Sequence, residues 1–428
     1  YEGKTYGTRK AIGAYTLQGS YGSSNSNGSF NYNGNTSYLI TELPNPNLRW
    51  EKTATFEVGA DLSFFANRLN TNLTYYNRLT SDKYAALSFP TSTGFSSVTN
   101  NNGEFRNQGI EIELSGKIID SKDWTWSASG NIAFNKNKIV SLPDNGMERN
   151  RINAFQVYTG NGDEKKWVGG QQEGQEPGIL YLYQADGIYR SYDEIPANLV
   201  RKYGSRTYYG PEAWNKLTAE QQNATTNFPI QPGDTKFHDV NGDDVIDEFD
   251  KVKVGATSPR WTGGFNTTLR WKNFQLYGRF DYALGFWLYE NSGTQSTTPW
   301  FMGCYQGTYN TPTMYYDTWS ESNPNAKYPR YLFADQNGKN NYIASTMFAY
   351  RGDYLAIREI SLSYSLPESV AKMLKMQRAE VSITGQNLGY ITGAKNVGSP
   401  EANPKDNGAV GQGYSLPRTI LFGVNLTF

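Results

Sequence analysis

The sequence predicts an all-β fold, namely the carboxy-terminal part of a transmembrane antiparallel β-barrel with long extracellular loops, over residues 1–428. Three observations predict it. Apolar and polar residues alternate over long runs, the runs pair through short turns, and long polar segments separate the pairs. No apolar run approaches the roughly 20 residues that a membrane-spanning helix needs, so a membrane crossing would use strands.

The composition agrees with such a barrel and argues against several classes of function. Aromatic residues make up 15% of the chain and charged residues 19%, and 40 Lys and Arg balance 40 Asp and Glu. Because the formal net charge is zero, no field favours nucleic acid, and no nucleic-acid partner is expected. The single cysteine, Cys304, excludes an intramolecular disulfide framework and a cysteine-cluster metal site.

The first two predicted hairpins show the alternation most clearly. Residues 53–65 turn back into residues 69–80, and five apolar side chains share one face of the first strand: Phe56, Val58, Ala60, Leu62 and Phe64. In the second hairpin, the alternating residues 110–118 lead through a polar turn into a strand that begins at Trp124. Charged residues on the opposite face indicate one side in lipid and one side in water.

Two further hairpins are predicted in the second half of the chain. Residues 261–271 pair with 274–289, and residues 354–366 pair with 380–391 through a longer connection that holds one short helical turn. Long segments rich in Asn, Gly, Pro, Ser and Tyr separate the hairpins, at residues 81–108, 191–258, 291–347 and 392–417. Outer-membrane barrels have short periplasmic turns and long extracellular loops, so the tight turns are assigned to the periplasm.

The strand count rests on weaker segments. If residues 124–138 ascend, a descending strand, placed near residues 151–169, is needed before residues 180–190 ascend again. The opening of the chain has strand-like pieces only at residues 11–19 and 37–41. These pieces bring the predicted total to about a dozen strands.

A secreted soluble β-sandwich or propeller is the competing interpretation, because its strands alternate in the same way. Soluble strands usually have about five or six residues, and compact domains rarely contain such long loops. The runs of ten or more residues in this sequence therefore favour the membrane barrel.

The last ten residues carry the most specific local signal. Apolar side chains occupy every second position up to the terminal residue: Ile420, Phe422, Val424, Leu426 and Phe428. This pattern resembles the assembly signal that outer-membrane barrels present to their insertion machinery. We predict that this membrane assembly strand descends to the periplasm and closes the barrel against a first strand that lies upstream of Tyr1.

Several motifs together carry a resemblance to a known family. They lie at residues 45–53 (NPNLRWEKT), 107–111 (NQGIE), 239–243 (DVNGD), 261–265 (WTGGF), 355–367, 385–388 (GQNL) and 417–419 (PRT). From residue 45 to residue 428 the chain resembles the carboxy-terminal barrel portion of the SusC/RagA family of TonB-dependent outer-membrane transporters from Bacteroidetes.

The resemblance implies a whole protein in the outer membrane with a barrel of about 22 strands, plugged by an amino-terminal domain. It further implies a SusD-like surface lipoprotein as partner, the TonB complex as energy source, and active import of a nutrient oligomer, either oligosaccharide or peptide. The signal peptide, TonB-contacting segment and plug of the family precede the matched region. A passive porin or a barrel-borne surface adhesin is the alternative function. A plug domain and a TonB-contacting segment upstream would support active import over this alternative.

An acidic loop at residues 239–250 predicts a cation site. Oxygen ligands fall at positions 1, 3, 5, 7, 9 and 12 of an EF-hand-type calcium loop, with Val245 contributing its carbonyl: Asp239, Asn241, Asp243, Val245, Asp247 and Asp250. Asp244 replaces the usual glycine at position 6, and Asp250 replaces the usual glutamate at position 12. Ca²⁺ is favoured over Mg²⁺ because the loop offers many protein oxygens, and an acidic turn that binds nothing is the alternative.

Enzymatic function is not expected. His238 is the only histidine, so zinc sites and Ser/His or Cys/His catalysis lack the imidazole that they need within this chain. A lone histidine beside an acidic loop is usually a hydrogen-bonded structural residue. No spacing identifies a carboxylate pair for glycoside hydrolysis.

Aromatic residues gather in the loop predicted at residues 291–347. Flat aromatic surfaces bind sugar rings, peptide side chains and protein partners, so the loop is a candidate substrate or partner surface. Its members are Trp300, Phe301, Tyr305, Tyr309, Tyr315, Tyr316 and Trp319. Packing of the loop on itself is the alternative. Trp287 and Tyr289, at the outer end of a predicted strand, are expected to belong to the membrane girdle.

Overall fold

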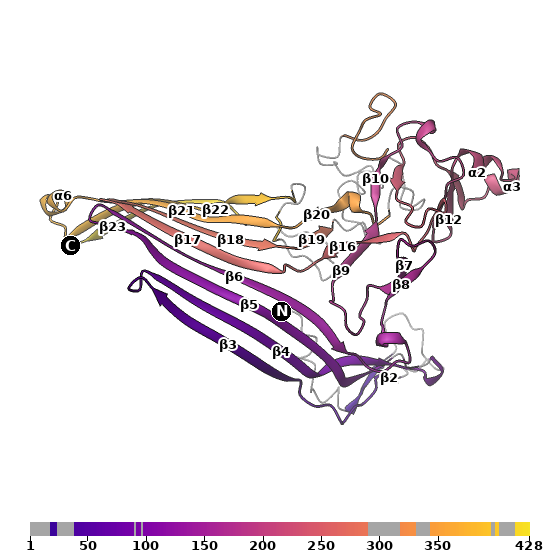
Figure 1. The fold of residues 1–428 in the computed structure, drawn as a ribbon, viewed down its shortest axis with the longest axis horizontal. Coiled ribbons are helices and arrows are strands. Elements are labelled where there is room, and N and C mark those ends of the chain that lie inside the picture. Colours follow the sequence, from indigo (N-terminus) through magenta and orange to yellow (C-terminus); the bar gives the residue numbers. More distant parts are fainter. Residues whose placement is uncertain are drawn as a thin grey trace.

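A computed structural model shows one large curved sheet that carries a separately folded lobe at one end (Figure 1). The structure describes residues 18–23, 38–89, 91–95, 97–289, 317–330, 343–394, 399–401 and 416–428. None of the described helices is long and apolar enough to cross a membrane.

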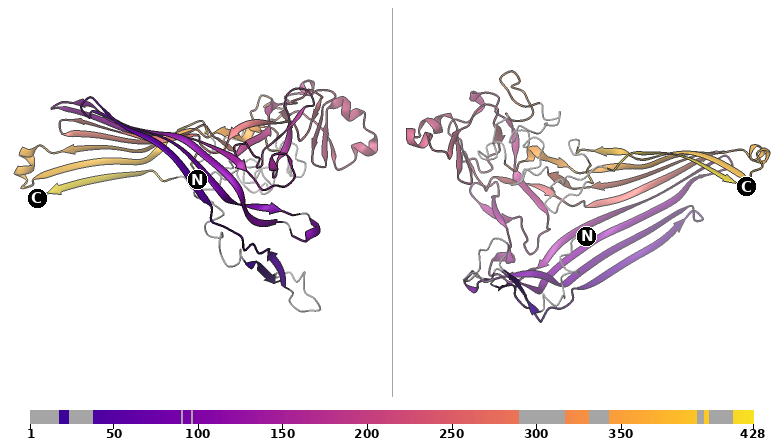
Figure 2. Two further views of the ribbon diagram at one scale, coloured as in Figure 1. Left: turned by 60° about the horizontal axis from the view of Figure 1, so that its bottom comes forward. Right: turned by 180° about the vertical axis from the view of Figure 1, so that it is seen from behind.

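The large sheet contains nine strands among the described residues, and every neighbouring pair is antiparallel. Their order is β23-β22-β21-β18-β17-β6-β5-β4-β3. The strands are β3 (Lys52–Phe64), β4 (Leu69–Ser88), β5 (Ser97–Asp120), β6 (Trp124–Ser141), β17 (Trp261–Trp271), β18 (Phe274–Leu284), β21 (Tyr354–Ser365), β22 (Arg378–Thr392) and β23 (Thr419–Thr427). Figure 2 shows this sheet as a twisted wall that curves about one side.

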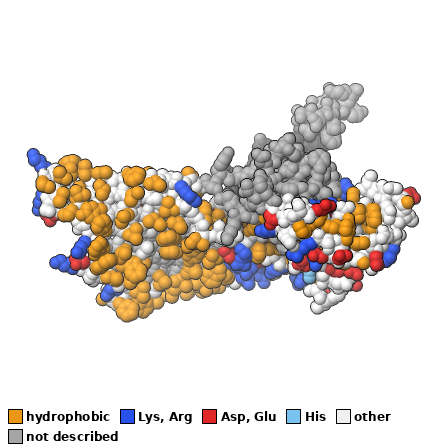
Figure 3. Space-filling model, turned by 90° about the horizontal axis from the view of Figure 1, so that it is seen from above, with side chains coloured by type: hydrophobic (Ala, Val, Ile, Leu, Met, Phe, Trp, Pro, Cys, Tyr) orange, Lys and Arg blue, Asp and Glu red, His pale blue; other side chains and the backbone are white. Residues whose placement is uncertain are grey.

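The convex face of the sheet is apolar. Cross-strand partners such as Trp261 and Phe134, or Phe265 and Gly130, place the predicted apolar series of each strand on the same face. Phe56 is 62% exposed and Phe422 is 81% exposed. A continuous apolar surface of this kind is not found on a sheet face that contacts water. Figure 3 shows hydrophobic side chains spread over this part of the molecule, so this surface is the lipid face.

One end of the sheet carries the short connections between strands. Tight turns join β3 to β4, β5 to β6 and β17 to β18, and the connection from β21 to β22 contains the short helix α6 (Glu368–Met373). Figure 1 shows α6 and the carboxy terminus at the same end of the sheet. The predicted hairpins, the helical turn and the descent of β23 toward the tight turns are therefore confirmed.

Residues 142–260 form a single excursion between β6 and β17, which corrects the predicted strand count. The segment near 151–169 contains only the short pair β7 (Phe155–Tyr158) and β8 (Lys165–Val168). Residues 180–190 contain β9 (Ile179–Tyr183), which pairs with β16 (Lys251–Ala256), and β10 (Ala185–Ile188), which pairs with β14 (Thr235–Phe237). Strands of four to six residues are too short to cross a membrane, so no extra descending strand exists here.

Two more predictions about the sheet were inexact. In the region of residues 11–19 and 37–41, the described residues form β1 (Ser20–Ser23) and β2 (Tyr38–Glu42), a separate two-stranded sheet, and residues 11–17 lie outside the described residues. Most of the predicted loop 81–108 is strand, because β4 and β5 continue past the membrane as a long hairpin. The short η1 (Thr91–Thr93) lies at its tip.

The lobe beyond the sheet has its own hydrophobic core. A four-stranded sheet of β13 (Asn227–Pro229), β12 (Arg206–Tyr209), β11 (Val200–Tyr203) and β15 (Val245–Ile246) contributes to it, and α2 (Pro211–Asn215) and α3 (Ala219–Gln222) flank this sheet. The buried cluster consists of Tyr183, Tyr189, Ile195, Leu199, Tyr208, Ile230, Phe237, Ile246 and Ile343. Its Ile343 comes from a second excursion, residues 285–353 between β18 and β21, so the two excursions share one core.

Short elements and polar contacts complete the lobe. It also contains η2 (Glu148–Asn150), η3 (Tyr192–Glu194), η5 (Thr346–Phe348), β19 (Trp287–Tyr289) and β20 (Ala349–Arg351). Asp234 is fully buried, and its Oδ1 accepts a hydrogen bond from Arg330 Nε at 2.7 Å, which links the two excursions. At the base of the first excursion, Arg260 Nη2 donates to Glu176 Oε2 at 2.6 Å, and the backbone N–H of Asn135 donates to the Arg260 carbonyl at 2.9 Å.

Candidate functional site

A β-bulge directs one arginine of the sheet toward the concave, lumen side. In the pairing of β21 with β18, Ile357 and Glu359 oppose consecutive residues, so Arg358 is the additional residue between them. Such an extra residue re-aims its side chain without breaking the sheet. The partner of Arg358 is Asp281, which alternates with the lipid-facing residues of β18 and therefore faces the lumen.

Arg358 also holds part of an extracellular loop against the lumen wall. Its Nε donates to Asp281 Oδ2 at 2.6 Å, its Nη1 donates to Glu401 Oε2 at 2.9 Å, and its Nη2 donates to Glu401 Oε1. The Tyr390 hydroxyl donates to Glu401 Oε2 at 2.9 Å, and Ser399 beside it is buried. Residues 399–401, which are part of the connection from β22 to β23, are thereby docked on the wall.

This Arg358 cluster binds and positions rather than catalyses. One guanidinium meets two carboxylates, and the bidentate contact with Glu401 is the geometry that fixes both partners most strongly. Sequence reasoning did not predict this cluster, because Glu401 lies 43 residues from Arg358 and the bulge leaves the alternation of β21 almost unchanged. The only signal was an arginine and a glutamate at consecutive positions in an otherwise alternating strand.

The acidic loop is a tight turn in which backbone amides occupy the carboxylates. Asp239 accepts hydrogen bonds from the N–H groups of Gly242 and Asp244, both at 2.8 Å. Asp250 accepts from Val240 at 2.9 Å and from Asp247 at 2.7 Å. Asp244 has a φ of 61°, a left-handed conformation that explains why glycine is usual at this position.

Electrostatics make this loop unfavourable for unpaired negative charge. Asp250 is fully buried, and loss of solvation together with the charges of Asp247 and Asp239 raises its pKa to about 6, although the two amide hydrogen bonds oppose the rise. Burial, with the neighbouring carboxylates of Asp247, Asp243, Asp250 and Asp163, raises the pKa of Tyr158 to about 12.

The donor set only partly fits a calcium ion. Asn241 Oδ1 is buried and accepts no hydrogen bond within the described residues, so one predicted ligand oxygen is free. The carboxylates of Asp239 and Asp250, however, point at backbone amides. In the part of the chain that the structure describes, no three His, Cys, Asp or Glu side chains are grouped to hold a metal ion. Calcium binding at Asp239, Asn241, Asp243, Val245, Asp247 and Asp250 stays a prediction.

His238 is hydrogen-bonded to a carboxylate, as the sequence suggested. Its Nδ1 lies 3.0 Å from Asp186 Oδ2, and Gln184 donates to the other oxygen of Asp186 at 2.8 Å. The imidazole is therefore fixed at the surface of the lobe by its hydrogen bond to Asp186.

The predicted aromatic loop is mostly beyond the described residues. Trp300, Phe301, Tyr305, Tyr309, Tyr315 and Tyr316 lie outside them, and their role stays a prediction. Trp319 is described, and it packs over Gly233 so closely that a Cβ atom there would lie 2.4 Å from Trp319 Cε3. Trp319 thus belongs to the packing between the two excursions.

The girdle assignment of Trp287 and Tyr289 is wrong. Both lie in β19, which pairs with β20 outside the large sheet, and Tyr289 is 6% exposed in a core with Tyr328 and Phe348. Alternation alone extended the predicted strand through Gly285, where a φ of 82° ends β18.

The entry motif NPNLRWEKT has a structural role. Arg49 exchanges backbone hydrogen bonds with the Asn101 side chain, at 2.6 and 2.7 Å, and its guanidinium contacts Asp82 at 2.9 Å. The Tyr84 hydroxyl donates to the Arg49 carbonyl at 2.6 Å, and Asn45 donates to the Thr99 carbonyl at 2.8 Å. The motif therefore ties the start of β3 to the hairpin that extends past the membrane.

Comparison with known proteins places the chain in a class. Residues 7–207 match the family model described as TonB dependent receptor-like, beta-barrel. A TonB-dependent receptor of Formosa agariphila is 28% identical over 399 residues, which cover 91% of this chain and 35% of the relative. The TonB-dependent receptor SusC of Bacteroides thetaiotaomicron is 25% identical over 401 residues, which cover 92% of this chain and 34% of the relative.

The fold is also similar to that of solved outer-membrane transporter structures. A structure of the RagAB peptide transporter matches with a TM-score of 0.63 at 20% identity, covering 98% of this chain and 39% of the matched chain. The chain thus spans about a third of the length of the curated relatives that it matches.

These observations define the protein class as an outer-membrane β-barrel of the TonB-dependent receptor type, with receptors and transporters rather than enzymes as its relatives. Within that class, the chain is similar in sequence to the TonB-dependent receptor SusC and in fold to the RagAB peptide transporter.

Proposed function

We propose that the whole protein imports a nutrient oligomer, an oligosaccharide or a peptide, across the outer membrane by TonB-driven active transport. A SusD-like surface lipoprotein is its proposed partner on the extracellular side. The chain described here supplies part of the lumen wall and a folded extracellular lobe. The similarity to TonB-dependent receptors over nine-tenths of the chain is the observation that carries this proposal.

The geometry of the lumen wall is consistent with a polar substrate. Arg358, Asp281, Tyr390 and Glu401 present charged and hydroxyl groups to the lumen side, where a glycan or a peptide backbone offers donors and acceptors. The name of the RagAB peptide transporter describes the cargo of that protein. For this chain both substrate classes stay in the proposal.

The test is uptake by cells that carry the full-length protein, with ligand identified by mass spectrometry after gentle purification. Active import predicts a co-purified oligomer and an uptake that stops when an uncoupler dissipates the proton-motive force. Uptake that persists under the uncoupler would instead support the passive porin. Binding to surfaces without uptake would support the adhesin.

A further inference from the structure

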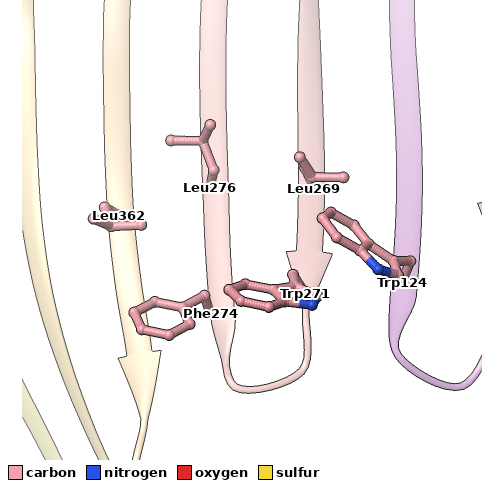
Figure 4. A pocket seen from close by; sticks show the side chains of 6 residues that line it. All are labelled: Trp124, Leu269, Trp271, Phe274, Leu276 and Leu362. Atoms are coloured by element: carbon pink, nitrogen blue, oxygen red, sulfur yellow. The ribbon is translucent and has the colours of Figure 1, made fainter.

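The lipid face of the sheet has a shallow hollow close to its tight turns. The hollow has a volume of about 300 Å³ and is lined by apolar and aromatic side chains: Trp124, Leu269, Trp271, Phe274, Leu276 and Leu362. The lining residues belong to β6, β17, β18 and β21, and Figure 4 shows Trp271 and Phe274 nearest the turn, with Leu269 and Leu276 above them.

Two pairs of rings that line the hollow are widely spaced. Ring centroids of Trp124 and Trp271 are 5.6 Å apart, and those of Trp271 and Phe274 are 6.0 Å apart, with interplanar angles of 25° and 17°. Toward the other end of the same strands, Phe134 lies 4.7 Å from Trp261 and Phe265 lies 4.7 Å from Phe280. Phe274 and Tyr364, also at the turn end, lie 4.6 Å apart, so the wider spacing is confined to the two ring pairs that line the hollow.

A cation lies at the water-facing border of the hollow. Lys272, in the turn between β17 and β18, is exposed, and its Nζ is 5.8 Å from the centroid of the Trp271 ring. Lys272 also borders a polar hollow on the other side of the sheet, together with Arg270 and Arg378. Its ammonium group thus stands at the level where hydrocarbon gives way to water.

We propose that this hollow binds one phospholipid of the periplasmic leaflet, with an acyl chain against the six lining side chains and the phosphate at Lys272. A lone apolar patch would only contact lipid in general. Here the charge complements a phosphate at one end, and aromatic rings at membrane interfaces favour the boundary between head group and chain. The proposal depends on the membrane location of the barrel and not on what the protein transports.

The experiment is native mass spectrometry of the full-length protein in detergent, titrated with palmitoyl-oleoyl phosphatidylglycerol. Leu269→Trp fills the hollow, and Lys272→Gln removes the charge while keeping the length of the side chain similar. Phe265→Ala, on the lipid face outside the hollow, and Lys202→Gln, in the extracellular lobe, are the matched controls. Heat-modifiable migration on gels verifies that each variant is a folded barrel.

The expected result is one tightly retained phospholipid in the unchanged protein and in both controls. Lys272→Gln should weaken its retention roughly fivefold, the effect of about one interfacial charge, and Leu269→Trp should weaken it at least as much. Equal retention in all proteins, equal loss in the controls, or preferential retention of lipopolysaccharide over the phospholipid would each overturn the proposal.

Discussion

Arg358 shows how a single inserted residue changes the inside of a barrel. The bulge turns its guanidinium to two carboxylates on separate segments, one in the wall and one in an extracellular loop. Hydrogen bonds to charged groups typically stabilise by about 1.5–3 kcal/mol, so this contact sets how firmly residues 399–401 are held.

Arg358→Met is expected to release residues 399–401 from the wall while leaving the barrel folded. Hydrogen exchange of the Ser399 and Glu401 backbone amides should rise roughly tenfold or more, as the loss of about 1.5–3 kcal/mol requires. The control is Arg279→Met, two residues before Asp281 on the lumen face of β18. Unchanged exchange in the Arg358 variant would show that Pro400 and its neighbours are held by packing alone.

A second residue-scale prediction concerns Asp234. Asp234→Ala leaves the Arg330 guanidinium without its buried partner, and loss of one member of a buried pair costs about 3–5 kcal/mol. The lobe should unfold at lower urea concentration, as monitored by tryptophan fluorescence that includes Trp319. Asp193→Ala removes an exposed carboxylate and should leave the midpoint unchanged.

Among the elements, the acidic loop concentrates carboxylates that accept hydrogen bonds from backbone amides and repel one another. Asp163, Asp243, Asp247 and Asp250 all lie near enough to Tyr158 to raise the pKa of its hydroxyl. A divalent cation would relieve their repulsion, although some carboxylates would have to exchange amides for the ion.

Calcium is therefore expected to raise the thermal midpoint of the lobe, and a chelator to lower it. Saturation at about 100 times the dissociation constant stabilises by about 2.7 kcal/mol. Differential scanning fluorimetry of the full-length protein measures the shift, and Asp243→Asn should reduce it. If neither calcium nor chelator moves the midpoint, the loop is an acidic turn that binds nothing.

The closing strand β23 presents Ile420, Phe422, Val424, Leu426 and Phe428 on the exposed lipid face, as its alternation predicted. Its role as an assembly signal is a separate matter. Phe428→Ala should reduce the amount of heat-modifiable protein in the outer-membrane fraction several-fold without changing synthesis. Asn425→Ala, on the lumen side of the same strand, should leave that amount as it is; equal effects of the two variants would contradict the assignment.

The elements also show what a sequence can and cannot specify. Alternation located the hairpins of the sheet because each barrel strand repeats one physical rule, lipid on one side and water on the other, over ten residues or more. Within 142–260 the strands are two to six residues long, and Ile179 of β9 pairs with Ala256 of β16, 77 residues later, so no local rule identifies these strands. The Arg358 cluster and the hollow on the lipid face depend on the register between neighbouring strands. The alternation within one strand carries no information about that register.

For the whole molecule, the lipid face makes a quantitative prediction about substitution. Phe265→Lys places a charge in the middle of β17 on the lipid side and should cost about 2–4 kcal/mol in urea unfolding from liposomes. Asn266→Lys, the next residue, points to the lumen and should cost much less. A similar cost at both positions would mean that the two faces of the sheet had been assigned the wrong way round.

The long excursion between β6 and β17 has a consequence for the order in which the protein folds. These two strands are hydrogen-bonded neighbours although residues 142–260 separate them. Closing a flexible loop of that length costs about 3 kcal/mol more entropy than closing a three-residue turn. A lobe that folds first removes this cost, because the contacts of Arg260 with Glu176 and with Asn135 bring the ends of the excursion together. A variant with a destabilised lobe, such as Asp234→Ala, is therefore expected to pair β6 with β17 more slowly and to form the barrel more slowly.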